Sequence, residues 1–128
     1  MSSDAIEVMG ITMTKNLGLN YEYMSWAGEP VYPYWVGEYQ EVPNPNEDGM
    51  KESTFILNGF TRGMNEGLET EKEKIEALFG KAGGYMVTTD NGSVVAIFYE
   101  NAQPVRTGDR ELKRIQIMLK VKEWRVIL

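Results

Sequence analysis

The chain contains neither histidine nor cysteine in its 128 residues. Without these side chains it cannot build the common zinc sites, a Ser-His-Asp relay or a thiolate nucleophile. A magnesium or calcium site would have to use carboxylates, because those ions prefer oxygen ligands, and the acidic residues are scattered along the sequence. No catalytic motif is present. We therefore expect no catalytic residues, no metal and no cofactor.

Long apolar runs are also missing. None approaches the ~20 residues that a membrane helix needs, and the first residues, Met-Ser-Ser-Asp-Ala-Ile-Glu, lack the basic start and apolar centre of a signal peptide. These absences favour a cytoplasmic protein without a membrane segment, and the lack of cysteine agrees with this. The apolar content of 42% and the charged content of 25% are ordinary for a globular protein. The length predicts a single domain, 1–128.

Basic residues are few, and they are unevenly placed. The 13 Lys and Arg face 19 Asp and Glu, and the net charge of -6 argues against general nucleic-acid binding, which depends on Lys and Arg. Residues 1–100 hold 6 basic and 16 acidic residues, whereas residues 101–128 hold 7 and 3. Two surfaces of opposite sign would suit head-to-tail contact between identical subunits. Alternatively, the C-terminal segment pairs its charges within its own domain.

The stretch 52–63, ESTFILNGFTRG, has the strongest strand pattern in the sequence. Alternate residues of a strand point to opposite sides, and here both sides carry large apolar groups. This favours a central position in a sheet over an edge. We interpret Asn58 and Arg62 within it as fold or interface residues.

Before this strand, the spacing of apolar residues predicts a helix over 3–17, capped by Ser2 or Ser3. Two extended segments follow at 20–26 and 31–41, and Pro33 marks an edge or the first paired residues because it cannot donate to a sheet. The loop 42–50 then makes a long antiparallel hairpin arm with the central strand. Six aromatic residues between Tyr32 and Phe60 predict packing within a sheet; the alternative is a stacking platform for bases or sugars.

After this strand, the pattern predicts an amphipathic helix over 68–79 and a hairpin of 85–89 with 93–100 around an Asn-Gly turn. A loop over 101–109 and a long final strand over 111–126 follow. In that strand Ile115, Ile117, Leu119 and Val121 should face inward, and a basic ribbon of Arg114, Gln116, Lys120 and Lys122 should face outward. The predicted fold class is α+β: an antiparallel or mixed sheet with two α-helices packed on one face and a long β-hairpin arm.

Three functional alternatives arise from the residues themselves. Carboxylates at Glu38, Glu41 and Glu52 could form an acid and base pair if one had a shifted pKa. The loop residues 44–48 faintly suggest calcium ligands but lack the EF-hand spacing, so a solvated hairpin tip is preferred. A small acidic binding or inhibitor module of a mobile element could use its charge to mimic nucleic acid.

Several stretches together resemble a known family. They are PYWVGEY at 33–39, the acidic hairpin tip, STFILNGFTR at 53–62, KEKI at 72–75, AIFY at 96–99, and TGDRELKRIQI at 107–117 followed by KEW at 122–124. Over residues 30–125 the chain is similar to tail-completion proteins of the tail-terminator class, found in phages and prophages of Gram-positive hosts.

The resemblance implies a structural protein of the virion and not an enzyme. Such a protein forms a homo-oligomeric ring, typically a hexamer, that ends tail-tube polymerisation and joins the tail to the head connector. It would be present in the host cytoplasm during assembly and then at the head-proximal end of the tail. The implied partners are the chain itself, the tail-tube protein and the head-tail connector protein, with no membrane and no sequence-specific nucleic acid. The expected interface residues are Glu47, Asp48, Arg62, Arg114, Lys120 and Lys122.

Overall fold

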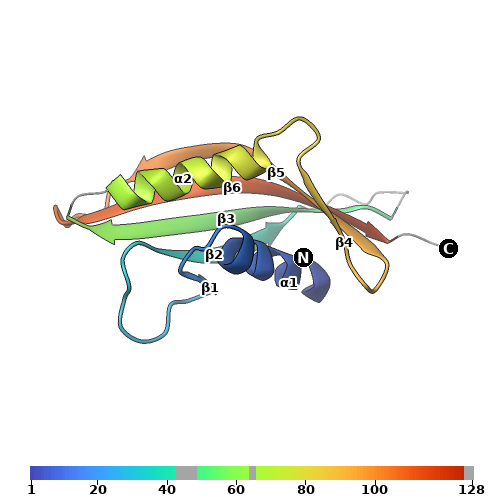
Figure 1. Ribbon diagram of the computed structural model, residues 1–128, viewed down its shortest axis with the longest axis horizontal. Coiled ribbons are helices and arrows are strands. Elements are labelled where there is room, and N and C mark those ends of the chain that lie inside the picture. Colours follow the sequence, from blue (N-terminus) through green and yellow to red (C-terminus); the bar gives the residue numbers. More distant parts are fainter. Residues whose placement is uncertain (43–48, 64–65, 126–128) are drawn as a thin grey trace.

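The fold is a six-stranded mixed sheet with both helices on one side (Figure 1). The computed structural model describes residues 1–42, 49–63 and 66–125. The elements in chain order are α1 (Ser3–Ile11), the π-helical turn η1 (Thr12–Asn16), β1 (Tyr21–Tyr23), β2 (Tyr34–Glu41), β3 (Lys51–Arg62), α2 (Glu66–Phe79), β4 (Tyr85–Thr88), β5 (Ser93–Val105) and β6 (Leu112–Arg125). The predicted α+β class is confirmed, and the sheet is mixed rather than antiparallel.

β3 lies at the centre of the sheet, as its sequence predicts. The strand order is β1-β2-β3-β6-β5-β4, so β3 pairs with β2 on one side and with β6 on the other. Both pairings are antiparallel, and the partner of β3's Leu57 is Gly37 in β2 and Ile117 in β6. β2 and β3 therefore form the expected hairpin. The tip of the predicted arm lies outside the described residues.

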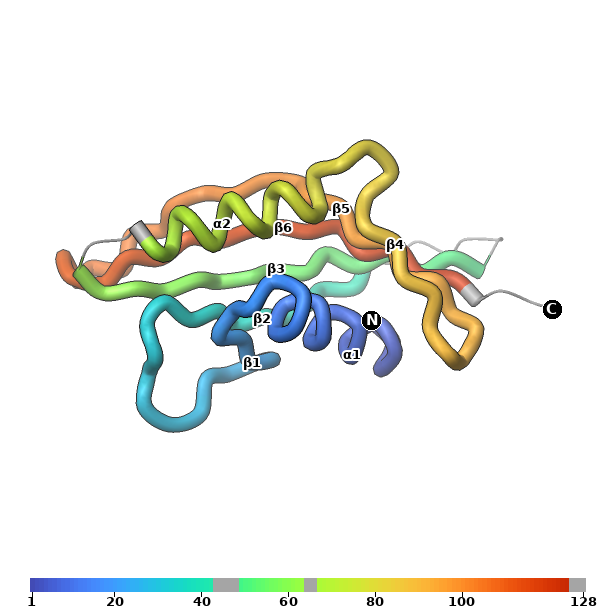
Figure 2. Tube along the Cα trace, viewed as in Figure 1, coloured from blue at the N-terminus to red at the C-terminus, as the bar shows by residue number. Residues whose placement is uncertain are grey.

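The two helices cover what we call the inner face of the sheet, which includes Trp35, Phe55, Leu57, Ile117 and Leu119. All five side chains are fully buried, and they share one core with apolar side chains from both helices. The helix residues in that core are Ala5, Val8, Met9 and Met13 of α1 and η1, and Leu68, Ile75 and Phe79 of α2. Figure 2 shows both helices in front of the strands. In the described part of the chain, no helix lies behind the sheet.

The N-terminal helix forms where the sequence predicts it, although its end differs in geometry. The Ser2 hydroxyl caps α1 by accepting a hydrogen bond from the Ala5 backbone N–H at 3.2 Å. The last turn widens into η1, where the Thr12 hydroxyl donates to the Val8 carbonyl at 2.7 Å. Such a bond competes with the backbone pattern of a helix.

Two strands differ from the sequence expectation. The segment 20–26 forms only the short β1, which pairs with β2 in parallel, because the loop between them crosses back before β2 starts. The predicted loop 101–109 is wrong in its first half, since β5 continues to Val105 after a bulge between Tyr99 and Asn101. The extra residue lets Ala102 pair opposite Ile117, so that the strand keeps a small apolar side chain on the inner face.

One hydrogen bond ties the sheet to its covering helix. The buried indole of Trp35 in β2 donates from Nε1 to the Glu71 carboxylate of α2 at 2.8 Å. A buried indole N–H usually finds such a partner, because leaving it unpaired costs free energy.

Within the described residues, no helix has the length and apolar content to cross a membrane.

Candidate subunit interface

The side of the sheet opposite the helices, the outer face, is uncovered in the described structure. It carries the residues that alternate with the core residues along each strand. Apolar side chains are half-buried there, with Val36, Ile56, Phe60, Phe98 and Met118 among them. A sheet face with this many large apolar groups and no covering layer is typical of a surface that contacts another protein.

Arg114 lies on this outer face, as the alternation of β6 predicts. Its guanidinium donates from Nε and Nη2 to the side-chain oxygen Oδ1 of Asn58, at 3.1 and 2.9 Å. The same guanidinium lies 5.7 Å from the centre of the Phe60 ring. Asn58 itself is buried. Arg114 is therefore a cation held in place by neighbours rather than a mobile surface charge.

An aromatic cluster continues the outer face at the start of β2. The Tyr34 ring stacks on Phe60 at a centroid distance of 5.0 Å and meets Trp26 at 4.9 Å and Tyr32 at 5.6 Å. These contacts fit the predicted packing of aromatic side chains in and beside the sheet. Burial, together with the neighbouring Tyr32, raises the pKa of the Tyr34 phenol.

Lys120 and Lys122 also face outward, as predicted. The prediction that this face is a basic ribbon is wrong, because acidic side chains lie beside the lysines. The Lys120 ammonium lies 3.7 Å from the Glu100 carboxylate and 4.0 Å from that of Glu52. The Lys122 ammonium sits 5.7 Å from the centre of the Phe98 ring. Because acids from β3 and β5 flank β6, the outer face is mixed in charge, and the uneven charge of the sequence is not expressed along this strand.

Arg62 lies apart from Arg114, Lys120 and Lys122. It ends β3, where its Nη1 lies 3.2 Å from Asp109 and its Nε donates to the Tyr32 hydroxyl at 3.3 Å. The pKa of Asp109 is lowered first by the Glu111 backbone N–H and then by Arg62. The sequence-predicted set thus divides into Arg114, Lys120 and Lys122 on the outer face and Arg62 at one end. Glu47 and Asp48 lie outside the described residues.

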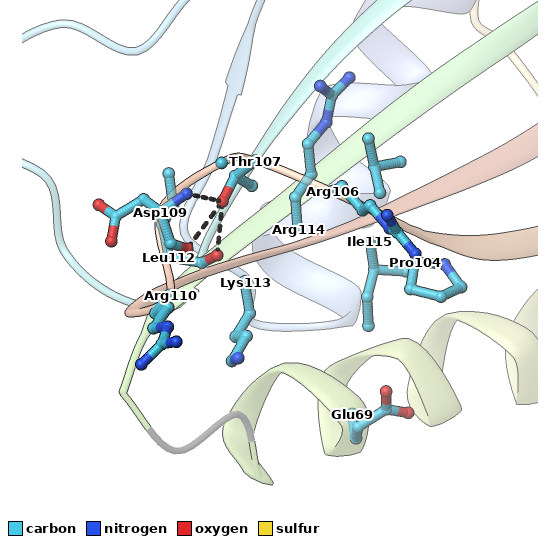
Figure 3. A pocket seen from close by; sticks show the side chains of 12 residues that line it. Glu69, Pro104, Arg106, Thr107, Asp109, Arg110, Leu112, Lys113, Arg114 and Ile115 are labelled. Atoms are coloured by element: carbon cyan, nitrogen blue, oxygen red, sulfur yellow. Dashed lines mark hydrogen bonds between the residues drawn. The ribbon is translucent and has the colours of Figure 1, made fainter.

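The unpaired basic residues gather beside the turn between β5 and β6, which the sequence reasoning did not single out. An open pocket of about 460 Å³ is lined there by Arg106, Arg110 and Lys113, with Pro104, Val105 and Leu112 as apolar walls. Figure 3 shows Lys113 pointing towards α2 while its neighbour Arg114 points the other way. In the described part of the chain, these three cations have no carboxylate within 4.0 Å. We call this site the basic pocket.

The backbone of this turn is held by a threonine and an aspartate. The Thr107 hydroxyl donates to the Leu112 carbonyl at 2.9 Å and accepts from the Asp109 N–H at 3.2 Å (Figure 3). The Asp109 carboxylate accepts from the Glu111 N–H at 3.0 Å. The Thr-Gly-Asp sequence is typical of a tight turn. It is the signal by which the cations on either side could have been placed together.

Carboxylates gather at a second place, away from the basic pocket. A cleft of about 340 Å³ between α1 and the β4–β5 turn is lined by Asp4, Glu7, Ile11, Val87 and Asp90, among others, with no Lys or Arg among its lining residues. Ile11 is 43% exposed. Asp4 accepts hydrogen bonds from Asn91 at 2.9 Å and Ser93 at 3.4 Å, whereas Glu7 and Asp90 are exposed. We call this the acidic edge.

Two of the carboxylates considered as an acid and base pair, Glu41 and Glu52, line one small pocket of about 190 Å³, but each has its own cationic partner. Glu41 lies 2.9 Å from the N-terminal ammonium of Met1, and Glu52 lies 4.0 Å from Lys120. Glu38 and Glu41 are exposed. Among the described residues, no group of three or more Asp and Glu side chains could hold a metal ion.

The sequence matches no protein-family model and no curated protein. The likeness to tail terminators therefore stays a prediction. The outer face, the basic pocket and the acidic edge are the features that bear on the function of the protein.

Proposed function

We propose that this chain is a structural tail-assembly protein of a phage or prophage, similar to tail terminators. It would form a ring, of six subunits by the resemblance, that ends tail-tube polymerisation and joins the tail to the head connector. The observation that carries the proposal is the uncovered outer face of the sheet. Apolar side chains that are only partly buried lie there between charged groups that contact neighbouring strands, which suits a protein that binds other proteins.

A second feature supports a ring in particular. A closed ring is built from head-to-tail contacts, in which each subunit uses two different patches that complement one another. The basic pocket and the acidic edge are two such patches: the first lies at one end of the longest axis, and the second lies away from it, between α1 and the β4–β5 turn (Figure 1). A two-fold dimer would instead require one self-complementary patch.

The test is the mass of the protein in solution and its effect on the tail tube. Light scattering across a concentration range should give a ring-sized oligomer, either alone or after mixing with the tail-tube protein encoded nearby. Electron microscopy should then show the protein at tube ends, and the tubes should stop growing. A protein that stays monomeric alone and with tube protein would contradict the proposal.

The net charge of -6 also suits the alternative of a small acidic inhibitor from a mobile element. The same measurement distinguishes the two. A monomer that binds a basic, nucleic-acid-binding protein would favour the inhibitor, whereas a stable hexamer would count against it.

A further inference from the structure

We propose that the basic pocket of one subunit binds the acidic edge of a second copy of this chain. The inference rests on the proposed ring and names the surfaces that close it. It assigns the head-to-tail contact to Arg106, Arg110 and Lys113 on one subunit and to Glu7 and Asp90 on the next. The outer face of the sheet is then free for the tail-tube or head partner.

The charges of the basic pocket require a partner that carries carboxylates. Its three cations have no ion pair within the described structure, and the two acids among its lining residues are already paired with other cations. Asp109 pairs with Arg62 at 3.2 Å, and Glu69 pairs with Lys72 at 3.8 Å. Glu111 in the same turn is exposed, and it leaves the cations in excess. The pocket is thus positive on a protein that is negative overall.

The walls of the pocket favour a protein segment over a nucleic acid. Pro104, Val105 and Leu112 give it apolar walls, and the Glu69 carboxylate lies at its helix side (Figure 3). A phosphate backbone would gain nothing from the apolar walls. An acidic side chain next to an apolar one would use both parts of the pocket.

The acidic edge has this combination. Glu7 and Ile11 are separated by four positions on α1, so they lie on the same side of the helix. Glu7 is exposed, and Ile11 is one of the few large apolar side chains that the described structure leaves open to solvent. Asp90 reaches the same cleft from the β4–β5 turn. The edge thus supplies carboxylates beside an apolar group, with no cation in between.

The geometry makes this contact intermolecular. The basic pocket adjoins the β5–β6 turn at one extreme of the long axis, whereas the acidic edge lies away from it, between α1 and the β4–β5 turn (Figure 1). The two patches of one chain cannot meet, but those of successive chains can. Repeating the contact closes a ring when the rotation from one chain to the next is a whole fraction of a turn.

Charge swapping tests the contact. In the first variant, which we call the tip variant after the tip of the β5–β6 turn, Arg110 and Lys113 of the basic pocket are both changed to Glu. In the second, the edge variant, Glu7 and Asp90 of the acidic edge are both changed to Lys. Each variant alone places like charges across the contact, so its self-association at low salt should fall about tenfold or more. An equimolar mixture should recover association, because every contact between the two variants is complementary again, and the fourfold variant should recover it within one chain.

Matched controls remove the effect of net charge. Changing Lys74 and Lys81 to Glu alters the total charge as much as the tip variant does, at exposed positions away from both patches. Changing Glu29 and Glu73 to Lys does the same for the edge variant. Both controls should associate like the original chain, and circular dichroism with thermal unfolding should confirm that all variants fold. Association should also weaken as salt rises, because exposed charges are screened.

The outcomes separate this contact from the proposed function. The association of each variant is measured in solution and on tail-tube ends. An assembly that tolerates both variants, or that fails to recover on mixing, overturns the contact and leaves the ring proposal standing. Rescue on mixing without any binding to tube ends supports the contact and contradicts the terminator function. Binding of duplex DNA that is lost in the tip variant, with unchanged self-association, would assign the pocket to nucleic acid and overturn the inference.

Discussion

The two faces of the sheet carry similar numbers of large side chains, but they serve different purposes. On the inner face, Phe55, Leu57, Ile117 and Leu119 are fully buried under two helices. One residue along the same strands, Ile56 and Met118 are only half-buried, and their neighbours are charged. The inner face supplies the stability of the fold, because free energy follows the apolar area removed from water. On the outer face part of the apolar area stays in contact with water, so less of that free energy is gained.

Neighbouring residues of β3 offer the sharpest test of this difference. Leu57→Ala should lower the free energy of unfolding by about 2–5 kcal/mol, since it opens a cavity in the closed core. Ile56→Ala should cost about 1 kcal/mol in the isolated chain, because the side chain is only partly removed from water. Urea denaturation of both variants measures the two values. Equal losses would mean that the outer face is covered in the isolated protein as well.

Gly59 tests how closely the inner face is packed. A methyl group at this position would overlap the ring of buried Trp35, with two ring carbons at 2.6 Å and a third nearer still. Gly59→Ala should therefore destabilise the protein by about 1–3 kcal/mol. Gly10→Ala is the control, since space is open around it and alanine favours a helix, so stability should rise by up to about 1 kcal/mol. Thermal unfolding that shows no loss for Gly59→Ala would contradict the close approach of Trp35.

Tyr21 tests the edge of the inner face, and the expected effect is the smallest. Its hydroxyl is buried without a hydrogen-bond partner among the described residues. Tyr21→Phe should leave stability unchanged or raise it by up to about 1 kcal/mol, since it removes a buried polar group that has no partner. A loss of more than that in urea denaturation would reveal a partner for the hydroxyl.

The same residue makes a prediction about alkaline pH. Burial, with a smaller contribution from Tyr23, raises the pKa of Tyr21 above its ordinary value. The unfolded chain then releases this proton first, so the free energy of unfolding should fall as the pH rises above about 10. In Tyr21→Phe this fall should be shallower but still present, because burial also raises the pKa of Tyr34 and Tyr99. An identical slope in both proteins would show that Tyr21 ionises freely.

The sequence predicts most of the fold because the local patterns agree with the tertiary structure. The alternation in β3 and β6 matches the inner and outer faces residue by residue, and the helix stripe of α2 matches its buried side. The predicted loop 101–109 fails for a local reason. Before the bulge, Ile97 and Tyr99 face the core; after it, Ala102 does. The two-residue alternation of the strand is therefore interrupted at the bulge, and the continuation of the strand does not show in the sequence pattern.

The candidate interface is predicted less well, and the cause is again physical. Periodicity places Arg114, Lys120 and Lys122 on one face correctly, but it contains no information about which strands lie beside β6. The carboxylates of Glu52 and Glu100 come from those neighbouring strands and neutralise the expected ribbon. Likewise, Arg106 and Lys113 come together only because β5 and β6 pair across the turn. Charge pairing between distant segments is a property of the fold.

The pairing of β3 with β6 has a consequence for synthesis. The whole of α2, β4 and β5 is translated between these two strands. Until β6 has left the ribosome, β3 has an open edge and Phe55 and Leu57 lack their final neighbours. Unpaired edges of this kind invite wrong partners. The second edge of β3 is therefore covered only when the last strand has been made, so the sheet is completed at the end of translation.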